Sequence, residues 1–228
     1  APIEQLRNER KELTAPMSTA EVEQNRVTSK DKDNTVQMEV RNVPSLTINI
    51  TRTSLKGNTL YDVEDKNDLK AIKASLIPSS KQVIQRTYKG YKDYEILKDS
   101  FNLPALPVGV YLLEYVPSDS RLARAYSLYY VSDLFVMTEE QPDKRNRYVV
   151  VDANEGQPVP GATIRIEYRK DNWSSKPLTK ILTTDSKGEA FITDPGYSSE
   201  VYVYTSKDQA FPAMDLKSNY DYYKANKN

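Results

Sequence analysis

Two neighbouring segments of the sequence alternate between apolar and polar residues. Val36–Arg41 places Val, Met and Val at every second position, and Leu46–Thr51 does the same with Leu, Ile and Ile. A period of two residues sends successive side chains to opposite faces of a sheet, with one face buried. Pro44 lies between the two runs, where a missing N–H is tolerated. The pattern therefore predicts two amphipathic β-strands.

Further strands are predicted along the first half of the chain. Val83–Tyr88 has the composition of a strand, and Val108–Val116 is apolar at successive positions, which indicates that both of its faces are covered. The Tyr- and Leu-rich segment Leu122–Val136 predicts either one long strand or two strands with a bend. The prolines of Leu103–Pro107 cannot join a ladder continuously, so they predict a corner.

One short helix is expected between these strands. Asn67 would cap it, and the helix would run through Leu76, with Leu69 and Ile72 on the same side. Pro78 would stop it. An irregular loop is a nearly equal alternative for this segment.

The second half of the chain shows the same β pattern after a polar break. Glu139–Asn146 is charged and contains a proline, which indicates a boundary between domains. Asp185–Gly188 has the composition of a hairpin turn. The strands predicted around it are Tyr148–Val151, Ile164–Tyr168, Leu178–Thr184, Glu189–Ile192, Val201–Tyr204 and Gln209–Met214.

Short strands at regular intervals, separated by Pro and Gly, predict a mainly β protein built of two tandem antiparallel β-sandwich domains. The first would span residues 35–138 and the second residues 139–228. Residues 1–34 would be a polar, partly helical lead segment or linker. Its apolar residues Ile3, Leu6 and Leu13 share one side of a first helix, and Ser18–Glu21 has the form of a capping box before a second.

Composition excludes several kinds of chemistry. The 228 residues include no Cys and no His, and 32 basic residues balance 32 acidic ones. Without Cys there is no disulfide, thiolate nucleophile or thiolate metal site, and without His there is no Ser–His–Asp triad. A net charge of zero without a basic stripe argues against nucleic-acid binding. No run approaches the roughly 18 apolar residues of a membrane span. We therefore expect a protein that is not an enzyme and has no cofactor or metal.

Four motifs in one stretch of the sequence point to a known family. Leu103–Glu114 is similar to the strand that closes an early macroglobulin domain in bacterial α2-macroglobulin-like proteins, and Val131–Val136 resembles the segment that crosses between two such domains. Val149–Ile166 resembles the opening of the next domain, and Thr184–Phe191 its following hairpin. The last two motifs are shared with other envelope β-sandwiches, including transthyretin-like domains. The order of all four favours the macroglobulin family, and the resemblance covers most of residues 36–214.

The resemblance implies macroglobulin or immunoglobulin-like sandwiches from the N-terminal part of a much longer chain. The implied location is the bacterial cell envelope, either periplasmic or at the surface. The implied role is that of a structural and interaction module in a protein that traps or inhibits proteases. Its partners would be the downstream domains of the same chain, and proteases through the full-length protein. The reactive thioester of the family requires a Cys, so that chemistry is absent from this chain.

Aromatic residues in polar surroundings are the candidate interaction surface. Trp173 lies in a polar loop, and Tyr220, Tyr222 and Tyr223 cluster near the end of the chain. Aromatic rings of this kind stack on sugars or anchor a protein partner. The alternative function is therefore a glycan- or ligand-binding surface module built of tandem β-sandwiches. Packing against a neighbouring domain is the simpler explanation for the tyrosine cluster, and packing over the sandwich edge is at least as good for Trp173.

An oxygen-ligand loop for calcium is a weaker candidate. Asp185 and Glu189 supply two carboxylates around Gly188, whereas calcium takes 6–8 oxygen ligands. A plain turn is the favoured interpretation of this segment.

Overall fold

The computed structural model describes residues 2–21, 26–30, 34–58, 61–92, 94–170, 174–193 and 197–216. The first half holds two helices and eight strands, which run in the order α1 (Pro2–Thr14), β1 (Met17–Glu21), β2 (Arg26–Thr28), β3 (Asn34–Arg41), β4 (Ser45–Arg52), α2 (Lys66–Ala74), β5 (Gln82–Thr87), β6 (Leu97–Leu103), β7 (Gly109–Pro117) and β8 (Ala125–Val131), with a 3₁₀ turn at Pro78–Ser80. The second half holds β9 (Leu134–Glu140), β10 (Arg145–Asp152), β11 (Thr163–Arg169), β12 (Leu178–Thr183), β13 (Glu189–Thr193), β14 (Tyr197–Tyr204) and β15 (Met214–Leu216).

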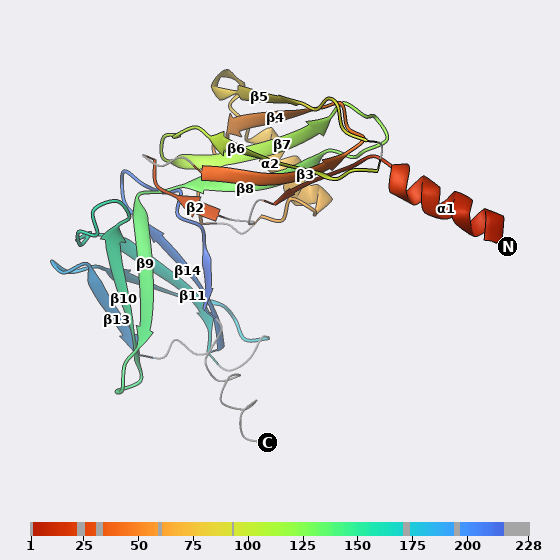
Figure 1. The fold of residues 1–228 in the computed structure, drawn as a ribbon. Coiled ribbons are helices and arrows are strands. Elements are labelled where there is room, and N and C mark those ends of the chain that lie inside the picture. The colour runs from red at the N-terminus through yellow and green to blue at the C-terminus, as the bar shows by residue number, and fades with distance from the viewer. Residues whose placement is uncertain are drawn as a thin grey trace.

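Two successive β-sandwiches form the body of the protein (Figure 1). In the first, the sheet β1-β3-β6 faces the sheet β2-β8-β7-β4-β5, and side chains from both sheets form one core. In the second, the sheet β13-β10-β9 faces the sheet β12-β11-β14-β15 around a separate core. All pairings are antiparallel except that of β2 with β8. The predicted fold class is therefore confirmed.

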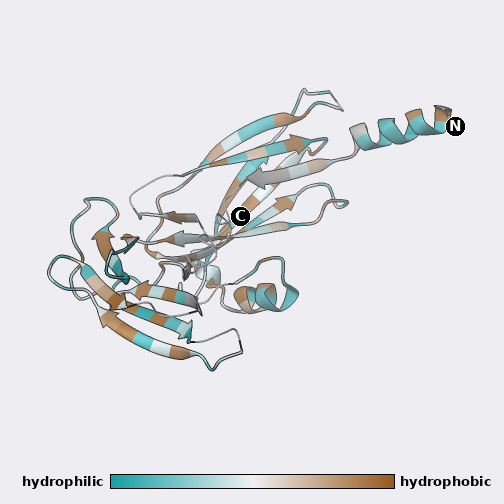
Figure 2. Cartoon of the chain, turned by 90° about the horizontal axis from the view of Figure 1, so that it is seen from below, coloured by the Kyte–Doolittle hydropathy of each residue, from teal (hydrophilic) through white to brown (hydrophobic). Residues whose placement is uncertain are grey.

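The strands carry alternating hydrophilic and hydrophobic residues, as the periodicity of the sequence predicts (Figure 2). In β3, Val36, Met38 and Val40 are buried in the first core. Strand β7 is covered on both faces, because its odd-numbered residues join the first core while Val110 and Leu112 join a second cluster under α2. That helix covers the outer face of the five-stranded sheet through the buried Ile72.

Helix α1 was expected from its apolar stripe, and it extends away from the first sandwich (Figure 1). Its Ile3 and Leu6 are exposed. The side chain of Arg41 donates hydrogen bonds to the carbonyl oxygens of Glu12 and Ala15, which ties the C-terminal end of the helix to β3. Among the described residues, no helix combines the length and apolar character that crossing a bilayer requires.

The prediction of a second short helix after Ser18 is wrong. Met17–Glu21 forms strand β1 and pairs along its whole length with β3. The capping signal was outweighed because the open edge of β3 offers backbone partners to every residue of this segment. Strands β1 and β2 thus lie within the predicted lead segment but pair with the first sandwich.

Helix α2 begins two residues earlier than predicted. Asp65 is its N-cap, and its carboxylate accepts hydrogen bonds from the backbone N–H groups of Asn67 and Asp68. Asp is as good a cap as Asn, so the sequence alone did not decide between the two positions. The helix ends at Ala74, two residues before the predicted Leu76, with Ser75 as its C-cap. Pro78, the predicted stop, instead begins a separate 3₁₀ turn.

Three other expectations change in detail. Leu122–Val136 forms two strands, and they enter different sandwiches.

The polar break at Glu139–Asn146 contains the turn of the β9–β10 hairpin, where Lys144 has a φ of 64°. Strand β9 therefore runs across the predicted boundary at residue 139. Asp185–Gly188 forms the expected tight turn, but it connects β12 and β13, which lie in opposite sheets.

The two sheets of the first sandwich are also joined by a polar contact. Arg86 on β5 donates two hydrogen bonds to the carboxylate of Asp99 on β6, at 2.6 and 2.8 Å. The Tyr88 hydroxyl donates a third at 3.0 Å. The hydrogen bonds from Arg86 lower the pKa of Asp99 below its ordinary value. The folded state therefore favours the charged carboxylate.

We predict that Asp99→Asn lowers the free energy of unfolding at pH 7 by about 1–2 kcal/mol. Hydrogen bonds to a charged group contribute about 1.5–3 kcal/mol, and solvent screening of the partly exposed Arg86 reduces that contribution. The contribution of Asp99 is complete above the ordinary carboxyl pKa of about 4 and is lost as the pH falls through its lower folded-state pKa. The difference between variant and parent should therefore shrink at pH 3. Urea denaturation at both pH values measures it, with the exposed Glu64→Gln as a control. An equal difference at both pH values would contradict the assignment.

Candidate functional site

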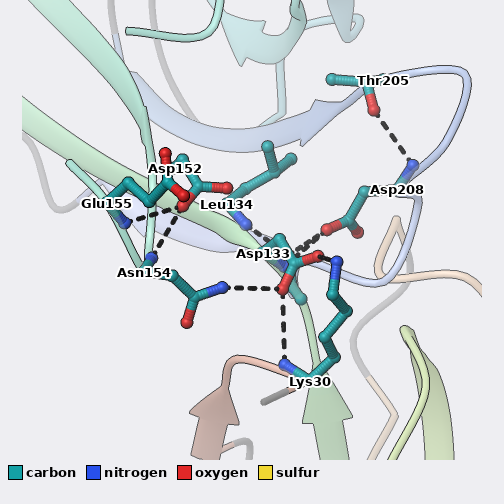
Figure 3. A network of polar contacts seen from close by, with 9 residues as sticks. Lys30, Asp133, Leu134, Asp152, Asn154, Glu155, Thr205 and Asp208 are labelled. Atoms are coloured by element: carbon teal, nitrogen blue, oxygen red, sulfur yellow. Dashed lines mark hydrogen bonds and ion pairs between the residues drawn. The ribbon is translucent and has the colours of Figure 1, made fainter. Parts of the chain in front are cut away.

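The junction between the two sandwiches contains a network of polar contacts that joins segments far apart in the sequence. The chain crosses from β8 to β9 at Ser132–Asp133, and the side chain of Ser132 is buried. Segments from both ends of the sequence converge on these two residues (Figure 3). The geometry of this crossing determines how one sandwich is held against the other.

A buried carboxylate fixes the crossing. One oxygen of Asp208 accepts hydrogen bonds from the hydroxyl of Ser132 at 2.9 Å and from the backbone N–H of Asp133 at 2.7 Å. The other oxygen accepts from the N–H of Ala210 at 3.0 Å. Asp208 is only 5% exposed, so an unpaired charge here would be costly. Charge-assisted hydrogen bonds to its own loop and to the crossing offset that cost.

Asp133 connects the crossing to two other segments. Its carboxylate forms an ion pair with the ammonium group of Lys30 at 3.0 Å and lies 3.4 Å from the side-chain nitrogen of Asn154. Its carbonyl oxygen accepts a hydrogen bond from the N–H of Ala153 at 2.7 Å. Because this ion pair is partly exposed, it contributes little energy. Its effect is to orient the three segments.

A first strap, residues 26–30, runs along one side of the junction. Strand β2 pairs in parallel with the end of β8, and the N–H of Ser132 continues the ladder by donating to the carbonyl of Thr28 at 2.9 Å. Val27 packs against the core of the second sandwich and also against the cluster under α2. This part of the predicted lead segment is therefore a component of the junction.

A second strap, residues 208–213, runs along the other side. Gly57 donates its N–H to the carbonyl of Gln209 at 2.8 Å and accepts from the N–H of Ala213 at 2.7 Å. A Cβ at Gly57 would lie 1.7 Å from the carbonyl oxygen of Phe211, so only glycine permits this approach. Ala210 packs into the cluster under α2, whereas Phe211 packs into the second core.

The second strap replaces part of a predicted strand. Gln209–Ala213 is irregular, and β15 begins only at Met214. The backbone groups of this segment bond to Gly57 instead of to a neighbouring strand. The apolar residues that suggested a strand are those that fill the two clusters.

The interaction surface predicted from sequence cannot be compared with this geometry. Trp173, Tyr220, Tyr222 and Tyr223 lie outside the described residues, so their role in binding a glycan or a partner remains a prediction.

The weak calcium candidate is a turn in the structure. Asp185 accepts hydrogen bonds from the backbone N–H groups of Lys187 and Glu189, both at 2.9 Å, and Glu189 pairs with Arg147. Both carboxylates are thus occupied by protein donors. Within the described ranges, no group of three or more acidic residues is placed to hold a metal ion.

Comparison with known proteins shows which solved structures have a similar fold. No protein-family model matches the sequence, and no curated protein matches it. Among solved structures, native alpha-2-macroglobulin from Escherichia coli spanning domains MG0-NIE-MG1 is similar, with 16% identity and a TM-score of 0.57 over 89% of this chain and 64% of that one. A structure of the same protein spanning NIE-MG1 has 14% identity and the same TM-score, over 89% of this chain and 98% of that one. The chain thus has the fold of the NIE-MG1 segment and spans about two thirds of the longer fragment.

We predict that Asp208→Ala loosens the junction, because the hydroxyl of Ser132 and the N–H of Asp133 lose their acceptor in a buried setting. Unsatisfied buried groups cost about 1–3 kcal/mol each. Hydrogen exchange at Asp133 and Leu134 should accelerate, while exchange in the core of β4 should not. Asp62→Ala, at an exposed turn, is the matched control. Unchanged exchange at the crossing would show that Asp208 does not hold it.

We predict a larger effect for Gly57→Ala. Because the added methyl group would overlap the backbone of Phe211, the second strap must move away from the first sandwich. Limited proteolysis should then cleave the strap faster, and the unfolding midpoint should fall. Gly90→Ala is the control, since a Cβ at Gly90 meets nothing within 4 Å and its cost is only that of a positive φ. Equal behaviour of the two variants would contradict this interpretation.

Proposed function

We propose that this chain is a non-catalytic structural and interaction module of a larger bacterial alpha-2-macroglobulin-like protein of the cell envelope. The observation that carries the proposal is the pair of sandwiches joined through one fixed crossing, in the fold of the NIE-MG1 segment. We propose downstream domains of the same longer chain as its direct partners. Proteases would be engaged only through the full-length protein, by trapping or inhibition.

The construction of the junction supports a frame function. A flexible linker would let two sandwiches rotate freely. Here three features restrict that rotation: the buried carboxylate of Asp208, the hydrogen bond from Ser132 that extends the β2–β8 pairing, and the close approach of Gly57 to the second strap. Such restriction benefits a frame that must hold distant parts of a large protein in register. The absence of Cys and His from the sequence also argues against a nucleophile–base pair.

We propose that the change of domain lies at Ser132–Asp133 rather than at residue 139. Strand β9 pairs with β10 along its whole length, and Leu134 packs in the second core. Residues 26–30 and 208–213 then belong to the contact between the two domains.

The test compares the isolated chain with the full-length product of its gene in a protease assay. We expect the isolated chain to leave cleavage of both a protein substrate and a small peptide substrate unchanged. The full-length product should block cleavage of the protein substrate while the peptide is still cleaved, because a trapped protease remains open to small molecules.

Two outcomes would overturn the proposal. Inhibition by the isolated chain would give this module a direct action on proteases. A full-length product that leaves protein cleavage unchanged would remove the trapping function. Gly57→Ala in the full-length product tests the frame itself, since a loosened junction should weaken inhibition, whereas Gly90→Ala should not.

A further inference from the structure

A small cavity with a mixed polar and apolar lining opens beside the second strap, at the contact between the two sandwiches. Its volume is 190 Å³. The first sandwich contributes Lys56 and Asn58, from the loop that carries Gly57. The second contributes Arg165 on β11, Tyr202, Val203 and Tyr204 on β14, and Gln209 and Phe211 of the second strap. We refer to it as the junction cavity.

The register of the second sandwich builds the floor of the junction cavity. Arg165 and Tyr202 are directly paired residues on β11 and β14, so their side chains emerge on the same face of the sheet. The guanidinium carbon of Arg165 lies 5.6 Å from the centre of the Tyr202 ring. The Tyr202 hydroxyl donates to Glu200, and burial together with this hydrogen bond raises its pKa, so the ring stays neutral.

The charge of the cavity lining is positive. Lys56 and Arg165 are its ionisable cations, and no carboxylate is among the lining residues. Arg165 is balanced by an ion pair with Glu167 further along β11. Lys56 is exposed and has no ion pair with any described residue. One cation is therefore available for a ligand that carries one negative charge.

The volume of the junction cavity and its uncharged polar side chains indicate which class of ligand it can hold. An apolar cavity of about 150 Å³ holds a benzene molecule, so this cavity accommodates one six-membered ring with a small substituent. Among the lining residues, Asn58 and Gln209 each carry an amide that can donate and accept, and Tyr204 carries a hydroxyl. These groups suit a ring that bears oxygen substituents.

We propose that the junction cavity binds a compact monocarboxylate built on one six-membered ring, with its carboxylate on Lys56 and its ring above the Arg165–Tyr202 pair. Such a ligand contacts both sandwiches at once. Its binding therefore stabilises their relative arrangement, and the stabilisation grows with the logarithm of the free ligand concentration once that concentration exceeds the Kd. This proposal does not depend on the proposed frame function.

Isothermal titration with two acids and their neutral counterparts tests the proposal. Benzoate is compared with benzamide, and galacturonate with galactose. We expect at least one acid to bind the parent chain at least tenfold more tightly than its neutral counterpart, and more weakly as salt increases. Binding by benzoate alone would identify an aromatic acid as the ligand class, and binding by galacturonate alone a sugar acid.

Variants locate the binding in the junction cavity. Lys56→Gln should weaken binding of the acid about tenfold, as expected for loss of one charge-assisted hydrogen bond. Lys81→Gln, at an exposed lysine before β5, is the matched control and should bind like the parent. Asn58→Leu keeps the cation and removes the amide, so it should also weaken binding. The backbone amide signals of Gly57 and Gln209 should shift on titration.

Three results would overturn the proposal. They are no binding of either acid at millimolar concentration, equal binding of an acid and its neutral counterpart, and undiminished binding by Lys56→Gln. The unfolding midpoint of each variant without ligand establishes that it is folded, since Lys56 and Asn58 are exposed and contribute little to either core.

Discussion

The arrangement of this protein depends on one buried negative charge and its need for donors. The carboxylate of Asp208 is removed from water, and it is stable there only while Ser132, Asp133 and Ala210 donate to it. Those donors belong to the crossing between the sandwiches and to the strap that follows β14. The cost of an unpaired carboxylate therefore opposes any motion that separates the strap from the crossing. Each sandwich has its own core, and this contact acts together with the hydrogen bond at Ser132 and the close approach at Gly57 to fix their mutual orientation.

The periodicity of apolar residues predicted the strands whose side chains are buried in the cores. Strands β3, β4 and β7 were predicted because their buried residues alternate or run continuously, which is the pattern that sheet burial imposes. Ser18–Glu21 was predicted to begin a helix because it has the form of a capping box, and only pairing with β3 makes this segment strand β1. The turn at Asp185–Gly188 was recognised, but no local signal tells whether the strands it connects stay in one sheet.

The junction was only partly visible in the sequence. The segment Val131–Val136 was identified through its family resemblance as the place where the chain crosses between domains. Asp208 was not, because its hydrogen-bond partners in the crossing are separated from it by 75 and 76 residues, and an aspartate in a polar loop is usually a turn residue. Gly57 gave no signal either, since its need for glycine comes from the backbone of Phe211 and not from its own φ angle. The fold follows from periodicity, whereas the junction follows from contacts that periodicity does not encode.

The two straps come from opposite ends of the sequence, and this has a consequence for biosynthesis. Residues 26–30 leave the ribosome early, while residues 208–213 leave it after nearly all of the second sandwich. While the second sandwich is being synthesised, Gly57 of the first sandwich therefore lacks its contact with the second strap. The apolar cluster under α2 is also incomplete, since Ala210 belongs to that cluster. Closure of the interface therefore has to follow synthesis of nearly all of the second sandwich. Until then, the backbone N–H and carbonyl of Gly57 have water in place of Gln209 and Ala213 as hydrogen-bond partners.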